Sequence, residues 1–412
     1  MNNTFRESLS LSVDDCVLVV GLGKTGFSVV EFLNKRNIPF AVADTREAPP
    51  FLDRFRASYP EHKVYLGDFD YNNFKRYSCL IVSPGVSIKH PAILRAQAEG
   101  ATILGDLDLF AAEAKAPVIA ITGSNGKSTV TTLVGLMAEE SAIRVKVGGN
   151  LGTPMLELLD ESAELYVLEL SSFQLDTCGD HFRPRAATVL NVSPDHMDRY
   201  GDVNEYADSK STIYKNAVTC VVNNDDVLVS GMVHSASGAV GFSTINPSAE
   251  YSIGLMDGAE WLFARHEPLM KCAEVGIRGR HNLANALAAC ALAETIEIPK
   301  GVMISVLRRF KGLDHRAQVV SELNGVVWIN DSKATNVGAC IAALSGMDRP
   351  VILIAGGDGK GADFELLRDA VREKVKAAFY IGRDADLMER ALGDLVPTNK
   401  TERVVEAGSF AS

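Results

Sequence analysis

Short runs of apolar, β-branched residues recur along the chain, and each is followed by a glycine or polar loop and then by a segment with helical periodicity. Apolarity within each run is continuous rather than alternating, which is typical of strands that are covered on both faces in a parallel sheet. The pattern therefore predicts an α/β protein. The clearest runs are Cys16–Gly21, Cys79–Gly85, Pro117–Gly123, Leu165–Ser172, Ala187–Ser193, Val326–Ser332 and Pro350–Gly357.

The length of the chain predicts more than one domain. At 412 residues it exceeds what one core usually serves, and about one domain per 150 residues suggests two or three, of which we expect three. The segment Ala111–Pro117 separates a helical pattern from a fresh strand, and Phe310–Arg316 follows a long alanine-rich helix. We therefore expect domains at 1–112, 113–312 and 313–412.

Charge and composition exclude several classes of protein. A formal charge of −11 and a pI near 5.3 argue against a broad nucleic-acid or anionic membrane surface, because both need clustered Lys and Arg. The first residues lack the pattern of an export signal, and no apolar run approaches the roughly 20 residues that span a bilayer. The seven cysteines are scattered without a C-x-x-C pair, which favours reduced thiols over a zinc site. We expect a cytoplasmic protein.

Polar side chains stand where the predicted strands end. Ser83, Lys127, Glu169, Asn191 and Asp331 come at the end of such a run or just after it. Open parallel sheets bind ligands in the crevice beyond the carboxyl ends of their strands. This placement favours function over packing for these five residues.

The first glycine-rich loop has the context of a dinucleotide-binding turn. Gly21, Gly23 and Gly26 follow a predicted strand, and Asp44 ends the next one about twenty residues later. Glycines at these positions let backbone N–H groups approach a diphosphate at a helix N-terminus. A tight turn without any ligand is the alternative, and nothing in the loop specifies nicotinamide.

The second loop, ITGSNGKST at Ile121–Thr129, is one residue too short for the usual phosphate loop G-x-x-x-x-G-K-[ST]. It nevertheless offers backbone N–H groups, an ammonium and two hydroxyls at a helix start, which suit β- and γ-phosphates and Mg²⁺. A capped helix with a solvated lysine is the alternative. The predicted phosphate-binding residues are Gly123, Ser124, Asn125, Gly126, Lys127, Ser128 and Thr129.

Two further residues are candidates for metal binding or proton transfer, whereas a third, Lys210, is not a candidate on sequence grounds alone. Glu169 lies in a strand too apolar to hold an unpaired charge, so it is a candidate Mg²⁺ ligand. His196 stands between Asp195 and Asp198 after a strand, which favours a functional histidine over a structural one. Lys210, on a predicted helix, reads by itself as a solvated lysine.

Seven motifs, in one order along nearly the whole chain, resemble those of the Mur ligases. They are TGSNGKST (122–129), LELSSFQL (168–175), NVSPDHMDRY (191–200), GRHNLANALAA (279–289), LDHR (313–316), NDSKATN (330–336) and GGDGKGADF (356–364). The shortened phosphate loop is the form that this family uses. The resemblance implies an N-terminal Rossmann-like domain holding a UDP substrate, a central ATPase domain with a parallel-rich sheet, and a C-terminal Rossmann-like domain.

The resemblance also implies roles for single residues. Lys127 with Ser128 or Thr129 would handle ATP phosphates and Mg²⁺, and Glu169 and His196 would hold metal. The lysine of the family that matches Lys210 is carbamylated, which turns a cation into a carboxylate suited to a second Mg²⁺. Lys127, His196 and Lys210 would thus be catalytic. The remaining implied contacts are Thr25, Asp44, Thr45, Arg46, Ser83 and Gly85 for uridine, Asn150 for the muramoyl group, Asn282, Asn285, Arg316 and Asp331 for adenosine, and Lys333, Thr335 and Lys360 for the amino acid.

The implied reaction is ATP-dependent ligation of D-glutamate to UDP-N-acetylmuramoyl-L-alanine through an acyl phosphate, a step of peptidoglycan synthesis that serves the cell wall, cell shape and cell division. We expect a monomer with no nucleic-acid or membrane partner. Within the family, NDSKATN selects D-glutamate, because sister enzymes carry a histidine-containing motif at the position of Lys333. The alternatives are another Mur-type or folylpolyglutamate-type ligase, a nicotinamide oxidoreductase resting on GLGKTG alone, and a nucleotide-binding remnant.

The sequence departs from the family at its end. It stops at RVVEAGSFAS, where the family continues through a helix, a strand and a serine-containing loop that helps to hold D-glutamate. We therefore expect an incomplete C-terminal domain. Such a chain would bind ATP and the UDP substrate but would ligate D-glutamate poorly and lose its acyl phosphate to water.

Overall fold

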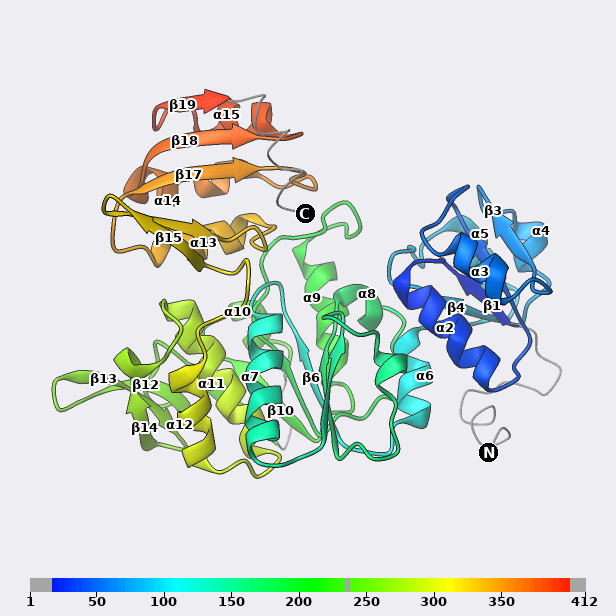
Figure 1. Ribbon diagram of the computed structural model, residues 1–412, viewed down its shortest axis with the longest axis horizontal. Coiled ribbons are helices and arrows are strands. Elements are labelled where there is room, and N and C mark those ends of the chain that lie inside the picture. The colour runs from blue at the N-terminus through cyan, green and yellow to red at the C-terminus, as the bar shows by residue number, and fades with distance from the viewer. Residues whose placement is uncertain (1–16, 234–237, 401–412) are drawn as a thin grey trace.

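The computed structural model describes residues 17–233 and 238–400, and within them the chain forms three successive units of strands and helices (Figure 1). The N-terminal unit, drawn in blue, lies beside the central unit, and the C-terminal unit, drawn in orange and red, covers another side of it. The α/β fold predicted from the sequence is confirmed. The expectations about Cys16, the first residues and the end of the chain lie outside the described residues.

A five-stranded parallel sheet organises the N-terminal unit. Its elements are β1 (Val17–Val20), α2 (Lys24–Lys35), β2 (Phe40–Asp44), α3 (Leu52–Ser58), β3 (Val64–Leu66), α4 (Tyr71–Phe74), β4 (Cys79–Val82), α5 (Pro91–Ala98) and β5 (Thr102–Leu104). The strand order is β3-β2-β1-β4-β5, and every residue of β1 and β2 is buried because both faces are covered. The order reverses between β1 and β4, so the loop after β1 opens where doubly wound sheets bind ligands.

Helix α6 (Asp106–Glu113) leads into the central unit, which is built on a nine-stranded sheet. The elements are β6 (Val118–Thr122), α7 (Lys127–Glu140), β7 (Val145–Gly149), η1 (Met155–Leu158), β8 (Leu165–Glu169), α8 (Ser172–Leu175), β9 (Ala186–Val189), α9 (Val203–Ser211), η2 (Thr212–Tyr214), β10 (Thr219–Asn223), α10 (Val227–Ser230), β11 (Ala239–Ser243), β12 (Tyr251–Met256), β13 (Ala259–Ala264), β14 (Glu267–Lys271), η3 (Cys272–Glu274), α11 (Arg280–Glu294) and α12 (Lys300–Arg309).

The central sheet has the order β14-β13-β12-β11-β10-β9-β6-β8-β7. It is parallel from β12 to β7, and β12, β13 and β14 pair antiparallel at the far edge. Strand β6 is wholly buried between β8 and β9, with α7 and α11 packed on one face and α6, η1 and α8 on the other. The loops that leave β6, β8 and β9 therefore meet at one sheet edge.

The C-terminal unit has two small sheets. Its elements are β15 (Gln318–Leu323), β16 (Val326–Asn330), α13 (Val337–Ser345), β17 (Val351–Gly356), η4 (Phe364–Leu367), α14 (Arg368–Lys374), β18 (Val375–Ile381), α15 (Ala385–Leu392) and β19 (Thr398–Lys400). Strands β17, β18 and β19 are parallel, and β15 and β16 form an antiparallel pair. The predicted domain boundaries near 112 and 312 stay predictions; α6 and α12 end close to them.

Two strand predictions were wrong in their environment. Strand β17, from the run at Pro350, pairs in a parallel sheet as expected, but only one of its faces packs on apolar side chains, and Ile352 and Ile354 on the other face are 61% and 54% exposed.

The run from Val326 was expected to be a strand buried in a parallel sheet, but β16 pairs antiparallel with β15, and Trp328 is 50% exposed. The turn between these two strands consists of Asn324 and Gly325, both with positive φ. Asn-Gly is the preferred two-residue hairpin turn, so this local signal outweighs the continuous apolarity of the run.

Candidate active site

The second glycine-rich loop joins β6 to α7 at the middle of the central sheet edge. Gly126 has φ 84°, and a Cβ there would lie 2.4 Å from Asn285 Oδ1, so only glycine fits. No side chain caps α7, which leaves the N–H groups of its first turn available to an anion. Asn191, after β9, holds the loop through two hydrogen bonds: its Oδ1 accepts from the N–H of Asn125 at 2.8 Å, and its Nδ2 donates to the Asn125 carbonyl at 3.1 Å.

Lys127 begins α7 and folds back over its own loop. Its Nζ donates to the carbonyl oxygens of Gly123 at 2.7 Å and Ser124 at 3.0 Å. Burial lowers the pKa of Lys127, and the nearby Glu169 carboxylate opposes that shift. The hydroxyls of Ser128 and Thr129 are buried in the same helical turn. One lysine and two hydroxyl-bearing residues thus lie in the first turn of α7, and their role in binding phosphate stays a prediction.

Glu169 is the last residue of β8, beside the phosphate loop, and its side chain is almost fully buried. Asn150 Nδ2 donates to Glu169 Oε1 at 2.6 Å, whereas Oε2 is buried without a hydrogen-bond partner. A buried carboxylate oxygen without a donor is costly, and a divalent cation would satisfy it. Within residues 17–233 and 238–400, no three His, Cys, Asp or Glu side chains gather as a ready metal cage. Hydroxyls, water or phosphate oxygens would have to complete the coordination, which is usual for Mg²⁺.

His196 lies in the loop after β9 with a left-handed backbone, φ 58°. Such conformations are uncommon outside glycine and cluster at functional sites. Burial lowers the pKa of His196 despite the nearby Asp195, so the ring is neutral at physiological pH, the state that a metal ligand needs. Phe173 packs against the imidazole edge-on, with ring centroids 4.8 Å apart, and fixes its orientation.

Lys210, on α9, is only 1% exposed and is therefore not a solvated helix lysine. Its Nζ lies 3.2 Å from the Gly123 carbonyl and 4.4 Å from the centre of the Tyr206 ring. Burial, with a contribution from nearby Lys127, holds the pKa of Lys210 well below its usual range. The amine thus lies beneath the phosphate loop, next to the other candidate catalytic residues.

The residues expected around adenosine lie on both sides of the junction between the central and C-terminal units. Asn285 Nδ2 donates to Asn282 Oδ1 at 3.2 Å on α11. Arg316 Nη2 donates to Ser128 Oγ at 3.1 Å, and Asp331 accepts the Ala317 N–H at 3.0 Å. Arg316 therefore already reaches the phosphate loop across the junction.

The three residues expected on the amino-acid side are placed differently from one another. Lys333 and Thr335 are exposed in the loop after β16, whereas Lys360 lies in the loop after β17 and approaches Asp195 with Nζ 3.6 Å from Oδ1. Sequence reasoning did not assign a role to Asp195 beyond flanking His196. In the sequence, the only signal for Asp195 is that it stands next to His196, and nothing there indicates that it lies between the central and C-terminal units.

The residues expected around uridine gather at the first glycine-rich loop. Asp44 is buried at the end of β2, and its carboxylate accepts a hydrogen bond from the Leu22 N–H at 2.7 Å. It also accepts two hydrogen bonds from the Arg46 guanidinium, from Nε at 2.8 Å and from Nη2 at 2.7 Å. Burial disfavours the charged carboxylate, but these hydrogen bonds outweigh it and lower the pKa of Asp44. Ser83 donates to the Gly21 carbonyl at 3.1 Å. Thr25 is partly buried on α2, and Thr45 and Gly85 are exposed.

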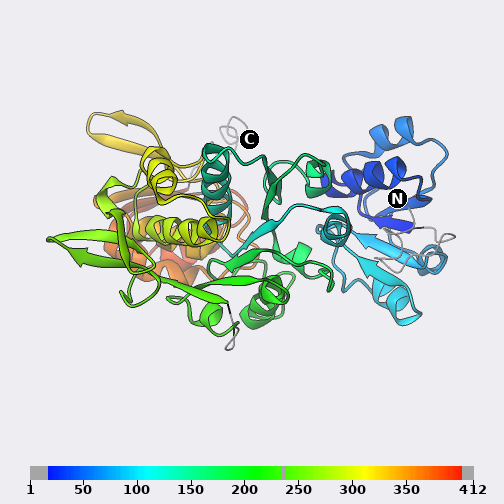
Figure 2. The same ribbon diagram turned by 90° about the horizontal axis from the view of Figure 1, so that it is seen from below.

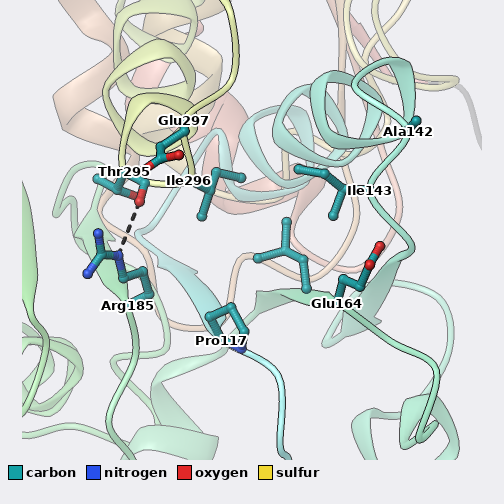
Figure 3. Close-up of a pocket in the computed structure, with 9 residues that line it drawn as sticks. Pro117, Ala142, Ile143, Glu164, Arg185, Thr295, Ile296 and Glu297 are labelled. Carbon is teal, nitrogen blue, oxygen red and sulfur yellow. Dashed lines mark hydrogen bonds between the residues drawn. The ribbon is translucent and has the colours of Figure 1, made fainter.

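A separate recess lies at the opposite, amino-terminal edge of the central sheet (Figure 3). Ile143, Leu165 and Ile296 are among its apolar lining residues, and Arg185 donates to the Thr295 carbonyl at 3.1 Å. None of the predicted site residues lines it. The chemistry therefore concentrates at the carboxyl edge, where the loops after β6, β8 and β9 meet.

Three family models match successive segments of the chain. Residues 15–105 match the model of the Mur ligase MurD-like N-terminal domain, residues 121–293 the Mur ligase middle domain, and residues 315–410 the Mur ligase glutamate ligase domain. The UDP-N-acetylmuramoylalanine--D-glutamate ligase of Methylococcus capsulatus is 50% identical over 400 residues, which cover 97% of this chain and 87% of that protein. The chain belongs to the Mur ligase family.

Other Mur ligases extend the comparison. The ligase of the same printed name from Pseudomonas aeruginosa is 48% identical over 403 residues, covering 96% of this chain and 90% of that one. Among solved structures, MurC from Thermotoga maritima matches 95% of this chain and 92% of its own, with a TM-score of 0.60 and 18% identity. MurF from Acinetobacter baumannii matches 100% and 91%, with a TM-score of 0.59 and 15% identity. At such low identity these structures support the three-part fold alone.

Proposed function

We propose that the chain ligates D-glutamate to UDP-N-acetylmuramoyl-L-alanine at the expense of ATP, in peptidoglycan precursor synthesis. As a Mur ligase it is an ATP-dependent, amide-forming enzyme that uses Mg²⁺. We base the choice of substrates on the relatives that are about 50% identical over nearly the whole chain. The observation that best supports phosphoryl transfer at this site is the Glu169 carboxylate, whose Oε2 is buried without a hydrogen-bond partner beside the phosphate loop.

The reaction needs an activated carboxylate. The alanyl carboxylate attacks the terminal phosphorus of ATP, the bond to ADP breaks, and an acyl phosphate forms. The amine of D-glutamate then attacks the acyl carbon, phosphate leaves, and the amine loses a proton. Phosphorylation is required because a free carboxylate is a poor electrophile at neutral pH. The products are the amide, ADP and phosphate.

Residues of the central unit suit the phosphoryl transfer. The free N-terminus of α7 and the ammonium of Lys127 would hold the β- and γ-phosphates, and the Ser128 or Thr129 hydroxyl with Glu169 and His196 would hold Mg²⁺. Bound Mg²⁺ offsets negative charge between two anionic reactants. The Lys127 hydrogen bonds to the Gly123 and Ser124 carbonyl oxygens hold the ammonium at the phosphate loop.

We further propose a carbamate on Lys210 and two Mg²⁺ positions. No carboxylate oxygen is among the hydrogen-bond partners of Lys210 within the described residues, although the side chain is almost fully buried. A buried, unpaired ammonium is costly. The neutral amine would instead attack the carbon of CO₂, form an N–C bond and release one proton to solvent, which leaves an anionic carbamate next to Lys127. That anion would supply ligands to a second Mg²⁺.

The assignment of the other contacts follows the same proposal. The N-terminal unit would take the UDP group, with Asn150 near the muramoyl group, and the residues Asn282, Asn285, Arg316 and Asp331 would surround adenosine. Lys333, Thr335 and Lys360 would face D-glutamate. Dependence on ATP and on a UDP-linked substrate supports a cytoplasmic location, and we propose a monomer. No helix among the described residues is both long and apolar enough to cross a membrane.

Phosphate release from ATP tests the proposal. We expect release only when UDP-N-acetylmuramoyl-L-alanine and Mg²⁺ are both present, and formation of the amide product only when D-glutamate is present as well. Release with L-alanine or a folate in place of these substrates would assign the chain to another amide ligase. Quenching of NADH fluorescence on titration with the chain, without any phosphate release, would instead support the oxidoreductase alternative for the GLGKTG loop.

A further inference from the structure

The N-terminus of α13, in the C-terminal unit, contacts the phosphate loop of the central unit. Asn336 is the N-cap of α13, and its Oδ1 accepts the Ala339 N–H at 2.8 Å. The amide nitrogen of the same side chain donates to Asn125 Oδ1 at 3.2 Å and to Asp195 Oδ2 at 3.0 Å. Asn125 Nδ2 lies 3.3 Å from Asn336 Oδ1 and donates back. One side chain therefore links a helix start, the phosphate loop and the loop that carries His196.

The backbone of α13 approaches the central unit just as closely. A Cβ on Gly338 would lie 2.7 Å from Ser193 Oγ and 2.9 Å from Ser193 Cβ, so no larger residue fits there without moving the helix. Ser193 also lies 3.4 Å from the Asn125 amide nitrogen. The polar contacts of Asn336 and this close approach fix the first turn of α13 from two sides.

Asp195 also contacts a second segment of the C-terminal unit, the loop after β17 that contains Lys360. Lys360 approaches its Oδ1 at 3.6 Å, and the N–H of His196 donates to the same oxygen at 2.9 Å. The side chain of Asp195 is only 9% exposed, so these are partly desolvated contacts and stronger than surface pairs. The two segments that would hold D-glutamate, around Thr335 and around Lys360, thus converge on one carboxylate of the central unit.

We propose that Asn336 is a positioning residue, which sets the distance between the phosphate loop and the amino-acid side of the site. The inference rests on the proposed function and deepens it. Attack by an amine requires reacting atoms within roughly 3–3.5 Å, and a misplacement of about 1 Å costs about a hundredfold in rate. Because Asn336 follows Lys333 and Thr335 in the same loop, its contacts to Asn125 and Asp195 hold those two residues over the phosphates.

The variant Asn336→Asp separates this role from helix capping. Aspartate is as good an N-cap as asparagine, so α13 keeps its cap, but the carboxylate cannot donate to Asn125 and lies against Asp195. We expect the KM for D-glutamate to rise at least about tenfold and kcat to fall, since each lost charge-assisted bond corresponds to about that factor. The Kd for the UDP substrate stays unchanged. Asn324→Asp, the same change in the exposed hairpin turn of this unit, serves as the control and leaves both constants unchanged.

Hydrogen exchange of residues 191–196 gives a readout that does not need turnover. These residues exchange faster in Asn336→Asp than in the wild-type chain if the contact docks the two units. Unchanged exchange, or a KM for D-glutamate within about twofold of wild type, overturns the inference. If the wild-type chain releases no phosphate at all, the proposed function fails, and the exchange result alone decides the role of Asn336.

A second pair of variants addresses the close approach. Gly338→Ala pushes α13 from Ser193, and we expect the same rise in the KM for D-glutamate. Adding Ser193→Gly removes the two atoms, Ser193 Oγ and Cβ, that would lie 2.7 and 2.9 Å from the new methyl group, and restores most of the lost affinity. A Gly338→Ala chain with wild-type kinetics and exchange contradicts the proposed docking.

Discussion

The side-chain amide of Asn150 donates a 2.6 Å hydrogen bond to one oxygen of Glu169, and the other oxygen of that carboxylate is buried without a partner. Asn150 follows β7 and Glu169 ends the neighbouring strand β8, so the register of two parallel strands sets this pair. One oxygen fixes the orientation of the carboxylate, which leaves the second for a cation. The asymmetry distinguishes a metal ligand from a strand-end glutamate that reaches water.

Glu169→Gln is expected to lower phosphate release by at least about a hundredfold, because a neutral amide loses the several kcal/mol of charge stabilisation that a Mg²⁺ ligand supplies. Added Mg²⁺ does not restore it. Phosphate release against Mg²⁺ concentration measures the effect. Glu164→Gln, on an exposed side chain just before the same strand, is the matched control and behaves as wild type. A Glu169→Gln chain with wild-type Mg²⁺ dependence would remove Glu169 from the metal site.

Lys127→Ala is expected to abolish turnover while binding of the UDP substrate stays nearly intact, because the two sites lie in different units of the chain. Isothermal calorimetry with UDP-N-acetylmuramoyl-L-alanine decides it. Lys115→Ala, on an exposed lysine before β6, controls for loss of charge. Loss of UDP-substrate binding in a folded Lys127→Ala chain would show that the two-site assignment is wrong.

Lys210→Ala is expected to be inactive and partly rescued by small carboxylates such as formate or acetate, which can fill the vacated position. The wild-type chain, supplied with carbon-13 bicarbonate, should show a carbamate signal by NMR that is absent from Lys210→Ala. Phosphate release with and without the added acids measures the rescue. Full activity of Lys210→Ala, together with no carbamate signal in the wild type, refutes the modification.

Asp106 gives a prediction about pH and stability. It is fully buried at the start of α6, accepts from Gln174 Nε2 at 3.0 Å, and burial raises its pKa to about 6. The folded state therefore binds more protons than the unfolded state between about pH 4 and 6, so this group makes stability fall as the pH rises through that window. The penalty persists at higher pH.

Asp106→Asn removes that penalty, because the amide is neutral at every pH and its oxygen can still accept from Gln174. We expect a gain of about 2–3 kcal/mol in unfolding free energy at pH 8 and a smaller gain at pH 5. Urea denaturation at the two pH values measures it. Asp53→Asn, at an exposed position in the first turn of α3, gives no comparable gain. A destabilised Asp106→Asn chain at pH 8 would mean that the charged carboxylate has a partner.

The carboxyl edge of the central sheet could be predicted from the sequence because its signals are local. Glu169 ends a strand, Lys127 and His196 each follow one, and parallel pairing brings the ends of such strands together. The burial of Lys210 could not be read from its own helix, where periodicity places a solvated lysine. It depends on α9 packing beneath a loop almost ninety residues earlier in the chain.

Contacts between the central and C-terminal units were even harder to predict from the sequence than the burial of Lys210. Asn336 and Asn125 are 211 residues apart, and their pairing depends on how two separately folded units dock. The hairpin at Val326 was predicted wrongly for the opposite reason. Its local turn signal, Asn324 and Gly325, is present in the sequence, but the prediction rested on the apolar run that follows and did not use this signal.

The N-terminal and central units share one apolar cluster, in which Phe110 of α6 packs edge-on against Tyr166 of β8, whereas the C-terminal unit has a separate cluster within Val337–Leu392. Segments with a common core melt together, and segments with separate cores melt independently. Heating should therefore divide this chain into two cooperative blocks, so that no single melting temperature describes it. A ligand that binds across the boundary between the blocks would draw the two transitions together, since it stabilises only the state in which both are folded.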